Sequence, residues 1–170
     1  YGNGLHGYEY GNNTSLNAGN SGTAARLLSA VLINSPIYIR ITGDNSLQKR
    51  DMKRIVEPLK EFGALFKIKK NTLPFSIKGT KFIRPINYNE TRGSAQCKSA
   101  VMLAALHAPG KTNLKCLKSR DHTELFFKNV LKVPINVKKN KKFDLIQVEG
   151  RKKFQGFSYD IPGDISSAAF

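Results

Sequence analysis

The chain has 170 residues and is 40% hydrophobic, which is enough for one domain with a core or for one lobe of a larger protein. Its formal net charge of +16 favours anionic partners, either nucleic acid or small substrates that carry phosphate and carboxylate groups. The longest apolar stretch, Ala100–Leu106, is far too short to cross a bilayer, so a transmembrane helix is excluded.

The first half of the sequence alternates between helical and strand periods. A Gly- and Asn-rich loop precedes a helix whose apolar face includes Ala24, Leu27 and Val31, and a half-buried strand follows at 37–41. A second apolar stripe predicts a helix over 52–62, ended by Gly63. Short strands are then predicted at 65–69, 75–78 and 83–88.

The second half repeats this order. The predicted elements are a helix over 94–107, a strand over 112–116, a helix over 122–131 and strands at 135–138, 143–148 and 157–161. Gly22, Ser94 and Ser166 are spaced 72 residues apart, the pairs Arg50-Asp51 and Arg120-Asp121 are 70 apart, and a third copy is predicted to begin at Gly163. A repeat of this length with mixed elements predicts a duplicated α/β module.

Three predicted helices begin with small or hydroxyl residues, at Gly22-Thr23, Ser94-Ala95 and Ser166-Ser167. Free backbone N–H groups and the positive end of the helix dipole make such beginnings suitable for anions, although Ser and Thr can equally act as simple N-caps. In a repeated module these beginnings can converge, and the repeat also supplies Arg50 and Arg120, whose guanidinium groups suit phosphate or carboxylate. The residues alone therefore indicate an anion-binding α/β module without naming a reaction.

Other features carry simpler interpretations. Cys97 and Cys116 form no C-x-x-C pair and are expected to be reduced, while three isolated histidines make a metal site improbable. The run Lys138–Lys142 is interpreted as a solvated hairpin turn. The loop Gly19–Thr23 lacks the lysine of a P-loop and the spacing of a dinucleotide-binding loop.

Five motifs in order resemble those of the 5-enolpyruvylshikimate-3-phosphate synthase family. They are the segments 17–27 (NAGNSGTAARL), 43–50 (GDNSLQKR), 94–100 (SAQCKSA), 119–124 (SRDHTE) and 162–170 (PGDISSAAF). The resemblance implies an inside-out α/β barrel lobe, here incomplete, built from βαβαββ-like units with helices inside and sheets around them. It also implies that residues 1–161 form about two units of a truncated first lobe, and that 162–170 form a hinge and the start of a second lobe.

The resemblance implies a role for each motif. It places phosphoenolpyruvate against Gly22, Arg50 and Gln96, with Thr23 and Arg26 supporting the loop. It places shikimate-3-phosphate against Ser94, the backbone of Ala95, Gln96, Ser119 and Arg120, and gives Asp164 a structural role near the hinge. Hydroxyl, amide and guanidinium groups are suitable donors for the oxyanions of both substrates. No cofactor or metal is implied.

The implied reaction is enolpyruvyl transfer. The 5-hydroxyl of shikimate-3-phosphate attacks C2 of phosphoenolpyruvate while C3 is protonated, and the tetrahedral intermediate then loses phosphate. The family's Lys-Ser element near its N-terminus and the acid, base and cations of its second lobe match nothing in this sequence. We therefore expect a fragment with part of a substrate site, no catalytic residue and no turnover by itself.

The departures from the family pattern are small. Asp51 stands where Pro is usual after Arg50, and Leu27 stands where many members have Pro, which affects loop rigidity but removes no binding group. Gly22 is retained where some glyphosate-insensitive members carry Ala, so glyphosate is expected to inhibit the parent enzyme. By resemblance the parent is expected to be a monomer in the cytoplasm, or in the plastid stroma of a plant or alga, with no nucleic acid or membrane partner.

Two alternatives stay open at this point. The related transferase that acts on UDP-N-acetylglucosamine shares the fold, but its Cys-bearing loop and arginine-rich N-terminal pattern are not seen here. A basic nucleic-acid-binding module is supported by the net charge of +16, but it would need aromatic residues alternating with Lys or Arg on one face. Phe62, Phe66, Phe126 and Phe127 instead stand at core-like positions.

Overall fold

The computed structural model describes residues 5, 14–150, 156–161 and 163, and within them two units follow one another. The first unit contains β1 (Ser15–Asn17), α1 (Gly22–Val31), β2 (Ile39–Thr42), α2 (Lys53–Glu61), β3 (Leu65–Lys67) and β4 (Phe75–Lys78), with the short 3-10 turns η1 (Leu32–Asn34) and η2 (Leu47–Lys49). The second contains β5 (Asn87–Glu90), α3 (Ala95–Ala105), β6 (Gly110–Leu117), α4 (His122–Asn129), β7 (Ile135–Lys139) and β8 (Phe143–Gly150).

The two units have the same topology. The first forms a four-stranded sheet in the order β1-β2-β4-β3, and the second forms one in the order β5-β6-β8-β7. In each sheet the first two strands are parallel and the other pairs are antiparallel. Each unit is therefore βαβαββ, which confirms the predicted duplication.

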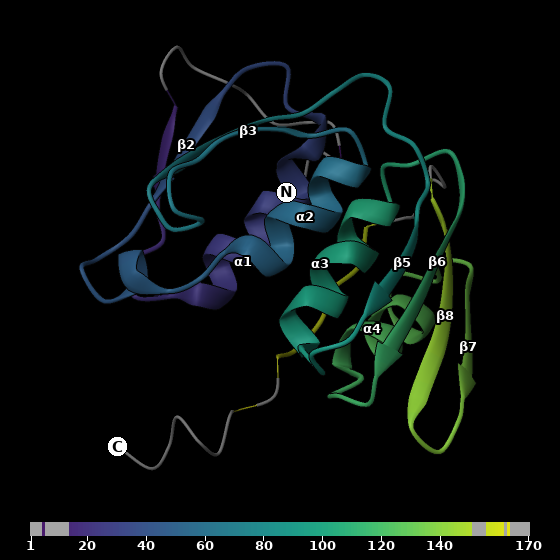
Figure 1. Ribbon diagram of the computed structural model, residues 1–170. Helices are drawn as coiled ribbons and strands as arrows, with labels where there is room; N and C mark the ends of the chain where they lie inside the picture. The colour runs from purple at the N-terminus through teal and green to yellow at the C-terminus, as the bar shows by residue number, and fades with distance from the viewer. Residues whose placement is uncertain (1–4, 6–13, 151–155, 162, 164–170) are drawn as a thin grey trace.

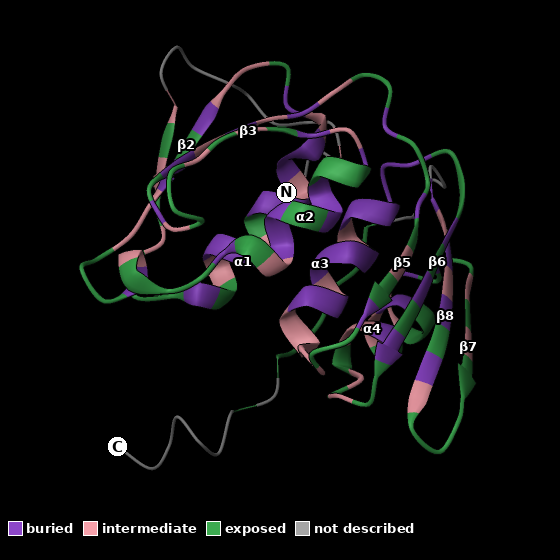
Figure 2. Cartoon of the chain, viewed as in Figure 1, coloured by how far each residue is buried: buried purple, intermediate pink, exposed green. Residues whose placement is uncertain are grey.

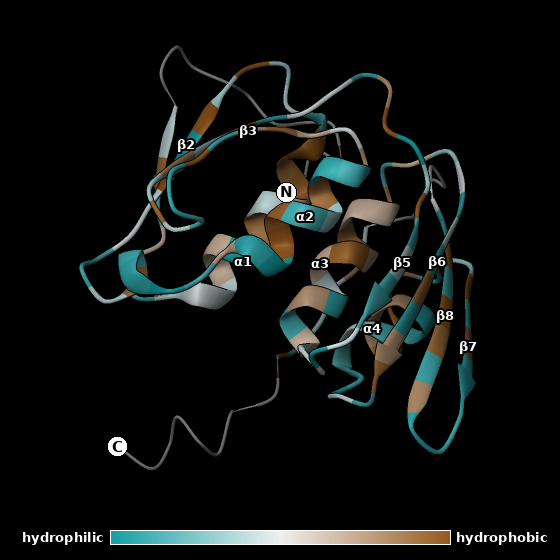
Figure 3. Cartoon of the chain, viewed as in Figure 1, coloured by the Kyte–Doolittle hydropathy of each residue, from teal (hydrophilic) through white to brown (hydrophobic). Residues whose placement is uncertain are grey.

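The helices lie between the two sheets. In Figure 1, α1, α2 and α3 occupy the middle of the molecule, with the sheet of the first unit on one side and that of the second on the other. Figures 2 and 3 show that buried and hydrophobic residues are frequent along these helices and occur in the strands of both sheets. A single core cluster includes residues of both units, such as Ile41, Leu59, Val101 and Ile146. The expectation of inner helices and outer sheets is thus met, and no closed barrel forms among the described residues.

Helix α3 is the central helix of this arrangement. It packs against α1, α2, β6 and β8, and its buried residues occur on all sides rather than on one stripe, as expected of an enclosed helix. Small residues such as Ala25 and Ser29 on α1 and Ala100 and Ala104 on α3 are fully buried. Small side chains at these positions allow the two helices, one from each unit, to pack closely.

Pro58 lies inside α2 and has no N–H to donate to the carbonyl of Arg54, four residues earlier. The Cys97 thiol of α3 donates to that carbonyl oxygen at 3.0 Å. Both cysteines are free and buried, as predicted. Burial raises the pKa of Cys97 to about 12, which keeps the thiol protonated and able to donate.

Some predicted elements differ from the structure. Strand β1 was not predicted, because three residues with the exposed ends of Ser15–Asn17 give no alternating pattern. The strand predicted at 83–88 is wrong in its position, because β5 begins at Asn87, after Pro85. The Arg84 N–H donates to the carbonyl oxygen of Phe62 and not to a neighbouring strand. The strand predicted at 157–161 is wrong, since those residues have no regular structure.

The predicted basic turn is confirmed. Lys138 and Lys139 are the last two residues of β7, residues 140–142 connect β7 to the antiparallel strand β8, and all five residues are exposed. The third copy expected from Gly163, including Asp164, Ser166 and Ser167, lies outside the described residues apart from Gly163 itself. No helix of the described residues is long and apolar enough to span a membrane.

Candidate anion-binding site

The parallel strands bring the predicted helix beginnings to one end of the molecule. In each unit the first strand leads into one helix and the second strand, parallel to it, leads into the next. The three central helices α1, α2 and α3 all begin near the lower side of the view in Figure 1. The positive ends of their dipoles therefore lie on the same side.

Helices α1 and α3 begin in the same way. Ser21 is the N-cap of α1 and its Oγ accepts from the Ala24 N–H at 3.0 Å, while Ser94 is the N-cap of α3 and its Oγ accepts from the Cys97 N–H at 3.2 Å. Ser94 thus corresponds to Ser21, and Ala95 to Gly22. The sequence spacing paired Ser94 with Gly22, whereas in the structure Ser94 corresponds to the preceding residue, Ser21.

Gln96 joins the two helix beginnings. Its Nε2 donates to Oγ1 of Thr23 at 2.7 Å, and its Oε1 accepts a hydrogen bond from Nη1 of Arg26. Gln96 is on α3 of the second unit, whereas Thr23 and Arg26 are on α1 of the first. The amide therefore fixes the relative position of two predicted site segments that are some 70 residues apart in sequence.

Gly22 lies close to two guanidinium groups. A Cβ at this position would be 2.9 Å from Nη1 of Arg26 and 3.4 Å from Nη1 of Arg50, so the absence of a side chain lets both guanidinium groups approach the backbone here. Arg50 is held from the other side by Asn20, whose Oδ1 accepts from Nη2 of Arg50 at 2.9 Å. Asn20 in turn donates to Oδ2 of Asp44 at 2.6 Å. Arg50 is therefore exposed and yet held in place by a hydrogen bond.

The site is electropositive. Arg26 is 8% exposed, and its pKa is lowered by burial first and then by the neighbouring charges of Arg54 and Arg50. A pKa lowered by like charges reports cations held close together, which a bound anion would relieve. The carboxylate of Asp51 raises the pKa of Arg26, but this effect is smaller than those of burial and of the two arginines. The Nε groups of Arg26 and Arg54 are buried and have no hydrogen-bond partner among the described residues.

Ser94 and Ser119 follow the ends of the neighbouring parallel strands β5 and β6. The buried carboxylate of Glu90 accepts from the Arg92 N–H at 2.9 Å and from the Ser94 N–H at 3.2 Å, which fixes the loop before α3. Gly93 has a positive φ of 66°, and a Cβ there would be 3.8 Å from Cβ of Leu117. The loop that carries Ser94 therefore adjoins the segment that leads to Ser119.

The predicted site residues are thus brought together to different degrees. Gly22, Thr23, Arg26, Arg50 and Gln96 form one connected group, with Ser94 and Ala95 in the adjoining turn of α3. Ser119 and Arg120 lie on the neighbouring loop; the Ser119 Oγ is buried and has no hydrogen-bond partner among the described residues, and Arg120 is exposed. Sequence reasoning assigned no role to Asn20 and Asp44, although both lie in the motif segments 17–27 and 43–50, and it did not identify Glu90. These residues fix loops through hydrogen bonds, which depend on the fold.

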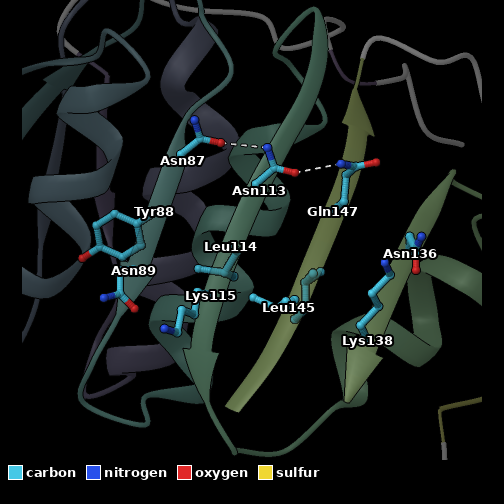
Figure 4. Close-up of a pocket in the computed structure, with 11 residues that line it drawn as sticks. Asn87, Tyr88, Asn89, Asn113, Leu114, Lys115, Asn136, Lys138, Leu145 and Gln147 are labelled. Atoms are coloured by element: carbon cyan, nitrogen blue, oxygen red, sulfur yellow. Dashed lines mark hydrogen bonds between the residues drawn. The ribbon is translucent and has the colours of Figure 1, made fainter. Parts of the chain in front are cut away.

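A separate hollow lies on the outer face of the second sheet and contains none of these residues. Figure 4 shows its lining, in which Asn113 donates to Asn87 at 2.7 Å and accepts from Gln147 at 2.8 Å. Its volume is about 670 Å³. The lining also includes polar side chains such as Lys115 and Lys138. No group of three or more His, Cys, Asp or Glu residues that could hold a metal occurs in the described part of the chain.

Comparison with known proteins gives a consistent result. The profile of the family described as EPSP synthase (3-phosphoshikimate 1-carboxyvinyltransferase) matches residues 3–170. A 3-phosphoshikimate 1-carboxyvinyltransferase of Thermotoga sp. (strain RQ2) is 46% identical over 154 residues, which cover 89% of this chain and 35% of that protein. That of Coxiella burnetii (strain RSA 331 / Henzerling II) is 44% identical over 156 residues, covering 91% of this chain and 34% of that protein.

Solved structures agree with these matches. The structure of EPSP synthase from Acinetobacter baumannii superposes with a TM-score of 0.83 at 38% identity, and the match covers 98% of this chain and 37% of that one. The chain therefore spans about a third of the length of the proteins it matches.

Proposed function

Because this chain belongs to the EPSP synthase family, we propose that the full-length protein transfers the enolpyruvyl group of phosphoenolpyruvate to shikimate-3-phosphate. The observation that supports this most directly is the Gln96 amide, which bonds to Thr23 and Arg26 across the two units. A single residue there can contact ligands held by either helix beginning, as a reaction between two anionic substrates requires.

We assign phosphoenolpyruvate to the first unit. Its carboxylate and phosphate would lie against the guanidinium of Arg50, beside the backbone of Gly22 that this guanidinium approaches. Thr23 and Arg26 would support this arrangement through Gln96. Several cations around one site stabilise the negative charges that accumulate when both substrates bind.

We assign shikimate-3-phosphate to the second unit. Its phosphate would accept hydrogen bonds from the Ser94 hydroxyl, the Ala95 N–H and the Ser119 hydroxyl, with the Arg120 guanidinium nearby. The buried Ser119 Oγ that lacks a partner among the described residues supports this assignment, because a buried hydroxyl without a hydrogen bond is costly.

The proposed reaction balances as an addition followed by an elimination. The 5-hydroxyl oxygen bonds to C2 of phosphoenolpyruvate, its proton is lost to a base, and C3 gains a proton. The bond from C2 to the phosphate oxygen then breaks, inorganic phosphate leaves, and C3 loses a proton to restore the double bond. None of the described residues is assigned as the acid or base, so this chain would contribute substrate binding and orientation.

Three further assignments follow from the family and belong to the same proposal. We propose that glyphosate inhibits the enzyme by occupying the space over Gly22, that the full-length protein is a monomer, and that it acts in the cytoplasm. The bacterial origin of the relatives favours a cytoplasmic over a plastid setting. Inhibition assays with glyphosate and measurement of the mass in solution test the first two.

The function is tested by assaying phosphate release from phosphoenolpyruvate and shikimate-3-phosphate with the full-length protein. We expect Gln96→Ala to reduce kcat/KM on the order of 10²-fold, because both substrates lose a shared orienting group. The matched control is Gln147→Ala, an amide on the outer face of the second sheet, which should change kcat/KM less than about twofold.

Two results would contradict the proposal. One is turnover with UDP-N-acetylglucosamine and none with shikimate-3-phosphate, which would favour the related transferase. The other is tight, salt-sensitive binding to random DNA without binding to shikimate-3-phosphate. The structure gives the nucleic-acid alternative little support, because Phe62 and Phe127 are fully buried and unable to stack on bases.

A further inference from the structure

A buried ion pair joins α3 to α4 behind the proposed shikimate-3-phosphate site. Nζ of Lys98 lies 2.6 Å from Oε1 of Glu124, and the two side chains are 1% and 6% exposed. The hydroxyl groups of the next residue on α3, Ser99, and the preceding residue on α4, Thr123, are 2.7 Å apart. None of these four residues has a part in the function proposed above.

The pair is unusual because of where it is buried. The other two salt bridges among the described residues, Lys53–Glu57 and Lys139–Asp121, are between exposed side chains. The free-energy cost of removing two charges from water offsets much of the attraction between them. Apolar residues of similar size would therefore stabilise the fold equally well. What an ion pair adds is direction, because the charges and hydrogen bond hold the two helices at one relative position.

The two partners stand one helical turn behind the proposed ligand-binding groups. Lys98 is four residues after Ser94, and its N–H donates to Ser94 O at 3.0 Å. Glu124 is in the first turn of α4, which begins directly after the segment that carries Ser119 and Arg120. The ion pair therefore connects the two segments that would contact the same phosphate.

We propose that Lys98 and Glu124 are positioning residues that set the spacing between Ser94 on one side and Ser119 and Arg120 on the other. This inference rests on the proposed function. Donors on two separate segments can bind one phosphate well only when their separation is fixed to within about 0.5 Å. The loops of Gly93 and Leu117 are close enough that a Cβ on Gly93 would be 3.8 Å from Cβ of Leu117, but such proximity has no direction and does not fix that separation.

The test uses the full-length protein and measures equilibrium binding of shikimate-3-phosphate as well as KM for each substrate. The main variant is Lys98→Met with Glu124→Met, which removes both members of the pair together. We expect it to fold, to bind shikimate-3-phosphate on the order of 10-fold more weakly and to change KM for phosphoenolpyruvate less than about twofold. A purely structural role would give no such difference between the two substrates.

Two further variants keep the test decisive. Glu124→Asp keeps the charge but shortens the side chain by one methylene, so it should fold and still weaken shikimate-3-phosphate binding selectively. The control Lys53→Met with Glu57→Met removes a pair whose side chains are 49% and 46% exposed, and it should change neither KM.

The outcomes separate this inference from the proposed function. If the unchanged protein neither binds nor converts shikimate-3-phosphate, the proposed function fails. If the unchanged protein is active but the folded Met/Met and Glu124→Asp variants bind shikimate-3-phosphate within about twofold of it, the positioning role is wrong and the function stands. If the variants bound both substrates more weakly by the same factor, the positioning role would also be wrong.

Discussion

At the scale of single residues, Cys97 combines a structural contact with a property that can be measured. Its thiol donates to the Arg54 carbonyl that Pro58 leaves free, and it is 1% exposed. Burial is the largest cause that raises its pKa from 9.0 to about 12. A thiol with a raised pKa favours the folded state only while it stays protonated, so this contribution is complete below pH 9 and is lost progressively between pH 9 and about 12.

We predict that the free energy of unfolding falls as the pH rises from 8 to 10, by about 1 kcal/mol from Cys97 alone. In Cys97→Ala this part of the decrease should disappear, although Cys116, whose pKa is raised to about 11, should still contribute. Urea unfolding of both proteins at pH 8 and pH 10 measures the difference. An equal decrease in both proteins would show that the Cys97 thiol is accessible to water or ionises normally in the folded state.

At the scale of elements, the N-caps of α1 and α3 allow cap function and ligand binding to be separated. Ser21 and Ser94 make the same hydrogen bond to an N–H three residues later. Ser21→Ala and Ser94→Ala should therefore each cost about 1 kcal/mol of stability. Of these two serines, only Ser94 is proposed to bind shikimate-3-phosphate.

We accordingly predict that Ser94→Ala raises KM for shikimate-3-phosphate several-fold more than Ser21→Ala does. Urea unfolding measures the stability of each variant, and steady-state kinetics with the full-length protein measures KM. If both variants lose similar stability and neither alters that KM, Ser94 is a cap and no more. Such a result would leave Ser119 and Arg120 as the groups to examine next.

The elements also show what the sequence can and cannot predict. Apolar periodicity located α1–α4 to within a few residues, and the repeated spacing predicted two equivalent units, because both follow from patterns along the chain. The edge strand β1 and the position of β5 depend instead on pairing with β2 and β6, which lie more than 20 residues away. Short strands of this kind have little signal of their own.

The candidate site also has a part that the sequence predicts and a part that only the tertiary packing reveals. The motifs identified Gly22, Arg50 and Gln96, but the bonds from Gln96 to Thr23 and Arg26 depend on the packing of α1 against α3. Lys98 and Glu124 lie in the motif segments 94–100 and 119–124, but their pairing was missed because charged residues are mostly exposed, and only a partner on another helix lets them be buried. Tertiary pairing of charges carries no periodic signal.

At the scale of the whole molecule, the two units share their core although each has its own sheet. Helix α3 of the second unit packs against α1 and α2 of the first, and the buried residues of both units form one cluster. Each unit alone would leave the inner side of its helices in water, which the hydrophobic effect opposes. The sequence duplication therefore does not produce two independent folding units, and the site between α1 and α3 depends on their joint packing.

This shared core predicts that damage in one unit weakens the other. Met52, immediately before α2, is fully buried, and Met52→Ala should cost about 2–5 kcal/mol. Hydrogen exchange on the full-length protein, read in β4 and in β8, measures the opening free energy of each sheet. We expect both sheets to lose the same amount, because they open together. The control Leu65→Ala, at a side chain that is 54% exposed in β3, should change either value by less than about 0.5 kcal/mol. A loss confined to β4, with β8 unchanged, would mean that the units open separately and that the contact between α1 and α3 is weaker than its burial indicates.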